Sequence, residues 1–408
     1  MKRLFALISV VLVMSFVLIA CAGKDDAKEN PGEPTTKPAE ENTDNEAPSE
    51  DPIKIGLTTV LTGDRSLEGE YASNAVKIIE EEINGAGGVL GRPIKIVIED
   101  ALGTDVGAVN AYKKLAADED IVAIIGSDSS NDNMAVSSSA IESKILTTAQ
   151  GSSPTLRDIC NNENPWLFQL RACDQTLCAA LIKYAVEEMG LKSFAVMHDT
   201  ETSSTDQARL FTEALASYGI EPELTVEFTT GTKDFSSHLV QIQNAGVEAI
   251  IGAAFQTEAA ILIQQTRDLG MDIPIFGSNA FADPVTIGLA GKATDNVYCA
   301  SAWVPNTPNE KGAALANKYK ELYDVDCGKA AAQVYDHVSV ICEAIKIAGT
   351  TDREAVRDAM TTIDSYQGAV TKYDCRTNGD CGRGGLLVKV EDEVAIILNQ
   401  ITSEKVIN

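Results

Sequence analysis

The sequence is poor in positive charge, in aromatic side chains and in histidine. Its 408 residues include 33 lysines and arginines against 60 aspartates and glutamates, so the formal net charge is −27. A surface this acidic repels phosphate backbones and anionic headgroups, which argues against nucleic acid as a partner. Aromatic residues make up only 5%, whereas 30 glycines suit tight turns between strands and helices. The length exceeds one ordinary domain and predicts two hydrophobic cores.

The motifs of common metal sites and catalytic centres are also missing. There is no C-x-x-C pair, and the three histidines (His198, His238 and His337) lie far apart, which argues against a metal site. G-x-S-x-G, G-x-x-x-x-G-K-[ST] and H-E-x-x-H do not occur. The glycines of residues 85–91 precede a predicted strand, which is the reverse of the order in a dinucleotide-binding loop. We therefore expect a protein that is not an enzyme and has no cofactor, with an extracellular enzyme as the alternative.

The one long apolar run lies at the start of the chain. A positively charged start precedes 17 uncharged residues (4–20), a pattern typical of an export signal. The run ends in Leu18-Ile19-Ala20-Cys21, which resembles the lipobox of bacterial lipoproteins, where the cysteine receives a diacylglyceryl group. We expect residues 1–20 to be a signal peptide and Cys21 to be lipidated, because two acyl chains make a stable anchor. An uncleaved signal anchor is the alternative.

Residues 21–52 are predicted to be a disordered acidic tether behind this lipid. Residues 22–52 contain five prolines, ten acidic residues and almost no large apolar side chains. Such a composition cannot bury enough apolar surface to offset the entropy of ordering the chain.

Eight cysteines remain besides Cys21, an even number that suits an oxidising compartment. Cys375 and Cys381 flank a turn-forming Arg-Thr-Asn-Gly-Asp segment, and we expect them to form a disulfide. Cys160 and Cys173 flank a short Asn/Pro-rich loop, and a disulfide there would contribute about 3 kcal/mol in the chain-entropy model. Free thiols are the alternative for both pairs. No pairing is predicted for the other four cysteines, Cys178, Cys299, Cys327 and Cys342.

From Ile53 onward, short β-rich runs alternate with helical patterns, which indicates parallel sheets built from βαβ units. Two such series follow one another, with predicted strands at 53–57, 93–99, 121–125 and 145–147, and then at 194–197, 223–228, 249–251 and 273–276. The helices between them include one that runs to Ser143 and another at 177–189. Two series predict an α/β protein with two doubly wound lobes. Towards the end of the chain, antiparallel strands are predicted at 368–373, 386–390 and 394–399.

An ordered set of motifs resembles the leucine/isoleucine/valine-binding proteins of bacterial ABC importers. The motifs are Ile-Lys-Ile-Gly-Leu at 53–57, Leu-Thr-Gly at 61–63, and the segments 83–91, 124–130, 151–156, 168–171, 233–236 and 333–336. The resemblance implies a periplasmic-binding-protein type I fold, in which two lobes joined by three crossings hold a ligand between them. It implies lobe 1 over 53–172, lobe 2 over 173–302, a return to lobe 1 over 303–366, and C-terminal strands over 367–408 that belong mostly to lobe 2.

The same resemblance implies a ligand site in loops rich in Gly, Ser, Thr and Asp, whose hydroxyl and backbone N–H groups suit a carboxylate. Each serine there is equally a candidate helix cap. Carried over by position, the implied ligand-binding residues are Glu68, Ser129, Ser130, Gln150, Gly151, Ser152, Ser203, Phe255, Asn279, Ala280 and Tyr335.

Asn279 stands where relatives have the acid that pairs with the ligand's ammonium group. An amide cannot supply that charge, so we expect Glu68, or else Asp128, to replace it. No Arg or Lys falls among the matched positions, which favours a small zwitterionic amino acid or a close relative. Phe255 and Tyr335 would then line the space for its side chain.

These observations predict an extracytoplasmic lipoprotein that captures a small ligand between two closing lobes. As a monomer, it would deliver this ligand to an ABC permease and ATPase complex, and would contact the membrane through its lipid only. A ligand-sensing lipoprotein that presents its closed form to a receptor is the alternative.

Overall fold

The computed structural model describes residues 51–401 of the chain. The predicted signal peptide, Cys21 and nearly all of the tether lie outside the described residues. Among residues 51–401, every helix is too short or too polar to cross a bilayer.

The first sheet is wholly parallel and has the strand order β2-β1-β3-β4-β5. Its strands are short and apolar, and β3 is buried at every position, as expected for a sheet covered on both faces. The strands are β1 (Ile53–Thr59), β2 (Ile94–Asp100), β3 (Ile121–Ile125), β4 (Leu146–Ala149) and β5 (Leu167–Gln169).

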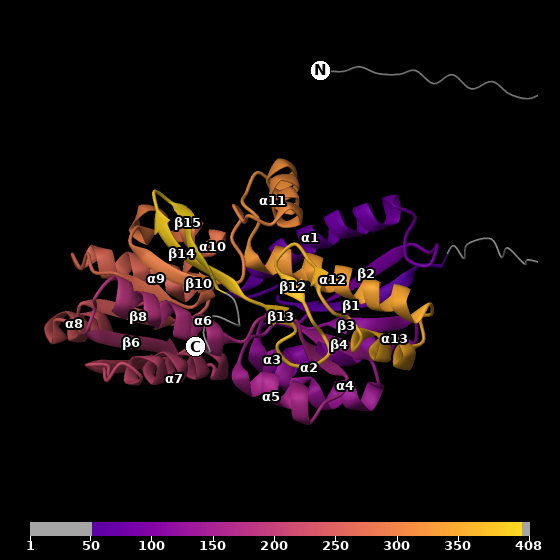
Figure 1. Cartoon of the computed structure of the whole chain (residues 1–408), viewed down its shortest axis with the longest axis horizontal. Coiled ribbons are helices and arrows are strands. Elements are labelled where there is room, and N and C mark those ends of the chain that lie inside the picture. The colour runs from indigo at the N-terminus through magenta and orange to yellow at the C-terminus, as the bar shows by residue number, and fades with distance from the viewer. Residues whose placement is uncertain (1–50, 402–408) are drawn as a thin grey trace, which may run out of the picture. The chain divides into compact units, whose positions relative to one another are not determined.

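Helices cover both faces of this sheet (Figure 1). On one face, Ile53, Ile55 and Leu57 of β1 pack with α1, α11, α12 and α13, whereas the opposite face packs against α2 and α4. Gly56 faces α2 so closely that a Cβ atom would lie 2.9 Å from Leu115 Cδ1. The helices of this lobe are α1 (Ser66–Gly85), α2 (Asp105–Ala116), α3 (Ser130–Ala135), α4 (Ser137–Ser143), α5 (Pro154–Asn162), α11 (Glu310–Tyr323), α12 (Lys329–Ala348) and α13 (Arg353–Met360).

The second sheet repeats this strand order and then extends it. Its order is β15-β14-β10-β9-β8-β6-β7, in which β6 to β10 are parallel and β14 and β15 are antiparallel additions. A hydrophobic cluster lies on each face. The strands are β6 (Phe194–Asp199), β7 (Leu224–Phe228), β8 (Ala249–Ala253), β9 (Ile275–Gly277), β10 (Val297–Ser301), β14 (Gly385–Glu391) and β15 (Val394–Ile401). The helices are α6 (Asp174–Lys183), α7 (Thr202–Ala216), α8 (Ser236–Ala245), α9 (Gln256–Asp268) and α10 (Pro284–Ala290).

The chain passes from the first lobe to the second between β5 and α6, and returns between β10 and α11. It passes over again just before β14. The segment ahead of that last crossing is a separate antiparallel sheet of β11 (Tyr366–Gln367), β12 (Lys372–Tyr373) and β13 (Gly382–Arg383). Two doubly wound lobes joined by these crossings form the fold that the sequence predicted.

The small sheet differs from the strand predicted at 368–373, and it packs in the core of the first lobe rather than in the second. The cause is the buried carboxylate of Asp336 on α12. It accepts hydrogen bonds from the backbone N–H groups of Ala369 (2.6 Å) and Val370 (2.8 Å) and from the Tyr373 hydroxyl (2.8 Å). These hydrogen bonds hold residues 369–373 against α12 of the first lobe. The C-terminal strands therefore join the second lobe only from β14 onward.

Local signals explain the remaining differences in the helices. The helix predicted to run to Ser143 is interrupted at Val136, and the helix predicted at 177–189 ends in a π-helical turn, Tyr184–Glu188. The prediction contained neither α5 nor α10. Both begin with an N-cap side chain followed by proline, Ser153-Pro154 and Asp283-Pro284, which is a helix-start signal.

Candidate ligand-binding site

The candidate site in the first lobe begins where the strand order reverses, between β1 and β3. Open α/β sheets bind ligands beyond the carboxyl ends of their strands at such a point. The loop after β1 carries Arg65, and the loop after β3 carries Asp128. Arg65 Nη2 donates a hydrogen bond to Asp128 Oδ1 at 2.5 Å, and both side chains are nearly buried.

The second lobe presents the corresponding loops, because its strand order reverses between β6 and β8. Ser203 follows β6, Phe255 follows β8 and Asn279 follows β9. The Phe255 ring centroid lies 4.2 Å from Cζ of Arg65, which is the geometry of a cation–π contact. The carboxyl ends of the two sheets therefore meet at Arg65.

A cavity of about 40 Å³ lies between these loops. Its apolar lining is limited to Ala254, Phe255 and Ala280. The polar and charged lining residues are Asp128, Ser130, Ser152, Arg171, Ser203, Ser204, Gln207, Gln256, Ser278, Asn279 and Lys329. A larger hollow of about 570 Å³, between Tyr71, Pro305 and Val394, involves none of these residues. The cavity at the strand ends is thus a polar site.

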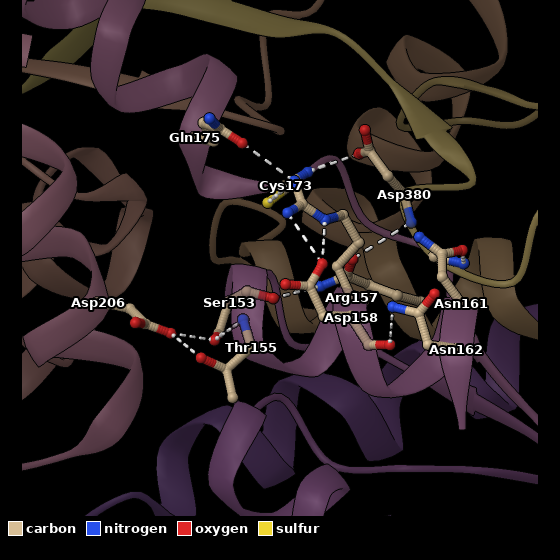
Figure 2. Close-up of polar contacts among 12 residues, drawn as sticks. Ser153, Thr155, Arg157, Asp158, Asn161, Asn162, Cys173, Gln175, Asp206 and Asp380 are labelled. Atoms are coloured by element: carbon tan, nitrogen blue, oxygen red, sulfur yellow. Dashed lines mark hydrogen bonds and ion pairs between the residues drawn. The ribbon is translucent and has the colours of Figure 1, made fainter. Parts of the chain in front are cut away.

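The two lobes also touch at the mouth of this cleft. Figure 2 shows Asp206 of α7 facing the start of α5, where its Oδ2 atom accepts from Ser153 Oγ at 2.5 Å and from Thr155 Oγ1 at 2.9 Å. Lys233 of the second lobe lies 3.7 Å from Asp64 of the first. These contacts join the lobes, so the structure represents the closed arrangement of the cleft.

Three buried cations, Arg65, Arg171 and Lys329, share the cleft. Burial disfavours the charge of Arg65, but Asp128 and then Glu68 outweigh it and raise the pKa of Arg65. Burial and the neighbouring Arg171 lower the pKa of Lys329. Burial would also raise the pKa of Asp128, yet Arg65 and Lys329 hold it below its usual value, so Asp128 is ionised. Burial, and then Asp128, raise the pKa of Glu68 to about 8, so Glu68 is mostly protonated at pH 7.

The predicted serines divide between capping and lining the cavity. Ser129 caps α3, with its Oγ accepting from the N–H of Asp132. Ser130 Oγ accepts from the N–H groups of Ser152 and Ser153, both at 3.2 Å, so one backbone donor expected for a carboxylate is already engaged. A Cβ atom on Gly151 would lie 2.5 Å from Ser130 Oγ, which is why only glycine fits there.

Two predicted residues lie beside the cavity, and another lies away from it. Gln150 donates to Gly126 O at 2.6 Å, and Glu68 lies 3.7 Å from Arg65. Tyr335 does not line the cavity, because it sits further along α12 and its hydroxyl donates to Glu82 of α1 at 2.6 Å. Its expected position beside the ligand's side chain therefore does not fit the structure.

The sequence analysis expected a site without Arg or Lys, and this expectation is wrong. Arg171 and Lys329 line the cavity, and Arg65 contacts two of its lining residues, Asp128 and Phe255. Arg171 lies in the motif 168–171, just after the end of β5. Because ligands bind beyond the carboxyl ends of such strands, its position in the sequence was a signal for the site. Lys329 begins α12, and the motif on that helix (333–336) pointed to Tyr335 instead.

The described cysteines are all buried free thiols, Cys160, Cys173, Cys178, Cys299, Cys327, Cys342, Cys375 and Cys381. The structure thus differs from both predicted disulfides. Burial, and then the neighbouring Cys375 thiol, raise the pKa of Cys381, so these two side chains are close. Cys173 instead lies 3.6 Å from Arg157 Nη1. Within residues 51–401, no three His, Cys, Asp or Glu side chains come together as a metal site.

Comparison with known proteins agrees with this architecture. A family model described as periplasmic binding protein matches residues 52–393, which span both lobes. The chain belongs to the periplasmic binding protein family. Membership in this family of solute-binding proteins places the protein outside the cytoplasm.

Relatives within the family are distant in sequence but similar over their whole length. The Leu/Ile/Val-binding protein BraC3 of Rhizobium johnstonii is 25% identical over 335 residues, 80% of this chain and 88% of that protein. The crystal structure of a leucine-binding protein from Thermotoga maritima has a TM-score of 0.78 at 24% identity, covering 86% of this chain and 99% of that one. A branched-chain amino acid transporter substrate-binding protein from Streptococcus pneumoniae, in complex with isoleucine, has a TM-score of 0.77 at 21% identity over the same shares of the two chains. The two structures show that the fold is shared.

Proposed function

We propose that this protein captures a small carboxylate-bearing solute, an amino acid or a close relative, and delivers it to an ABC importer. The observation that carries the proposal is the polar cavity at which the carboxyl strand ends of both lobes meet. A ligand held by both lobes binds the closed form more tightly than the open form, and therefore shifts the population towards closure. The names of the relatives favour an amino acid as the ligand.

The chain itself supplies groups for each part of such a ligand. Ser130 lines the cavity, and its hydroxyl proton has no acceptor among residues 51–401, so it can donate to a carboxylate. The ligand's ammonium group would take the place of the Arg65 guanidinium next to Asp128, the ionised acid of the cleft. Phe255 would then contact the ligand in place of Arg65. The groups in this arrangement bind without catalysing a reaction.

We further propose that the protein is a monomer held at the membrane by a lipid on Cys21, with residues 21–52 as the tether. A tethered binding protein stays close to its importer while its lobes remain free to open and close. The acidic composition of the tether supports this, since like charges keep a chain extended.

The experiment is a ligand search followed by a measurement of closure. Mass spectrometry of protein purified from its host identifies carried-over ligand, and a thermal-shift screen covers amino acids and other small carboxylates. A true ligand is expected to raise the melting temperature and to reduce the radius of gyration in small-angle scattering. If a bound small molecule leaves that radius unchanged, the proposed closure is wrong. If no solute of the screen binds, the solute-binding proposal falls.

A further inference from the structure

Arg171 is a buried guanidinium that lines the cavity, and two of its nitrogens lack a hydrogen-bond partner among the described residues. It lies directly after β5, is 6% exposed and lines the cavity. Its Nε and Nη2 atoms have no hydrogen-bond partner among residues 51–401. These two nitrogens form one side of the guanidinium fork, which binds both oxygens of a carboxylate. A buried charge left unpaired in this way destabilises a protein unless a ligand satisfies it.

Lys329 is a second buried cation at the same wall of the cleft. It is the first residue of α12, is 5% exposed and lies beside Arg171. Its Nζ atom is 3.9 Å from Asp128 Oδ2, too far for a hydrogen bond. Two cations side by side in a buried site repel each other, and an anion between them would relieve the repulsion.

The carboxylates of the cleft already have other partners, so they do not fully pair with Arg171 and Lys329. Asp128 is shared between Arg65 and Lys329. Asp174, the acid with the strongest influence on Arg171, accepts a hydrogen bond from Gln207 at 2.7 Å. Asp283 accepts from the backbone N–H groups of Val285 (3.0 Å) and Lys329 (2.9 Å).

The lining also argues against a branched-chain amino acid. A leucine or isoleucine side chain is stabilised by apolar contacts, and the cavity offers only Phe255 and two alanines. Polar groups displaced from water by an aliphatic side chain would lose their hydrogen bonds. A ligand with a second polar end fits this lining better.

Building on the proposed solute-binding function, we infer that the ligand carries two carboxylates, as an acidic amino acid or a related dicarboxylate does, and that Arg171 and Lys329 bind the second one. The first carboxylate occupies the end of the cavity next to Ser130. An ammonium group, where the ligand has one, lies against Asp128.

Calorimetry with the purified protein tests this with L-glutamate, L-aspartate, succinate, L-glutamine and L-leucine. L-glutamate and L-glutamine are nearly the same size and differ in the charge of the side chain. One of the two acidic amino acids is expected to bind about 100-fold or more tightly than L-glutamine, because an amide leaves both cations unpaired. Binding of succinate would show that the ammonium group is dispensable. L-glutamine or L-leucine binding as tightly as the acidic ligands would overturn the inference.

Arg171→Gln is expected to abolish the preference for the acidic ligand over L-glutamine. Arg157→Gln is the matched control, because it removes a nearby arginine that bonds Asp158 and Gln175 and does not line the cavity (Figure 2). Circular dichroism checks that each variant is folded. If the Arg171 variant does not fold, the same ligand preference is measured on Lys329→Gln. An unchanged preference in the folded variants would overturn the inference.

The outcomes separate this inference from the proposed function. Tight binding of L-leucine with closure of the lobes would reject the two-carboxylate ligand and leave the solute-binding proposal standing. Binding of none of the five compounds would reject the inference, and the wider screen would then decide the proposed function by itself.

Discussion

Asp206 joins the closed lobes through direct hydrogen bonds, and Asp206→Ala should weaken ligand binding from outside the cavity. Its Oδ2 atom accepts hydrogen bonds from Ser153 and Thr155 of the other lobe (Figure 2). These bonds run from one lobe to the other, so we expect them to break when the lobes open. Asp206 also pairs with Arg209 of its own helix at 3.4 Å, but Arg209 keeps its shorter ion pair with Glu213 (2.8 Å) in the variant. The main loss is therefore the contact between the lobes.

The size of the effect follows from the geometry. A hydrogen bond to a charged group contributes about 1.5–3 kcal/mol. The two bonds share one oxygen at the rim of the cleft, where water competes, so we take about 2 kcal/mol for the pair. If the open form dominates without ligand, this destabilisation of the closed form raises the apparent Kd about 30-fold.

Calorimetry and small-angle scattering measure the two consequences. The variant should bind the same ligand more weakly. Its radius of gyration should therefore reach the value of the closed form only at a higher ligand concentration. Asp158→Ala is the control, because within residues 51–401 the carboxylate that it removes pairs only with Arg157 of the same helix. If the Asp206 and Asp158 variants have the same Kd, the hydrogen bonds at the mouth do not hold the lobes closed.

Three other predictions concern the anchor, the thiols and the pH. Cys21→Ala should leave unlipidated precursor or protein shed into the medium; unacylated protein that resists alkaline extraction would contradict this. The Cys375 and Cys381 thiols are neighbours in the structure, so peptide mapping without reduction should find them linked in protein exported by its host, whereas free thiols at this pair would refute the redox argument. Burial raises the pKa of Glu68 to about 8, so its contribution to stability is complete below pH 4.5 and is lost as the pH rises through 8. Glu68→Gln should therefore reduce the fall in melting temperature between pH 4.5 and pH 8, and an equally steep profile in the variant would assign the dependence to another group.

The course of the chain through the fold could be predicted from sequence because it depends on local patterns. The apolar run of β3 specifies a strand wherever it lies in the fold, and β3 begins and ends at the residues predicted, 121 and 125. The prediction failed at Val136, where a helix is interrupted without a Pro or Gly. It failed again at β12, where a buried carboxylate distant in the chain bends the backbone.

The sequence by itself determined the two lobes, the order in which their strands appear, and the loops of Ser130 and Phe255 as parts of the site. Tertiary structure alone decided the charge of the cleft. Arg65, Arg171 and Lys329 are separated by more than a hundred residues each, and they meet because three crossings bring the carboxyl ends of two sheets together. Whether a charged side chain is buried, paired or left free depends on neighbours that are distant in the sequence, and only the folded chain supplies them.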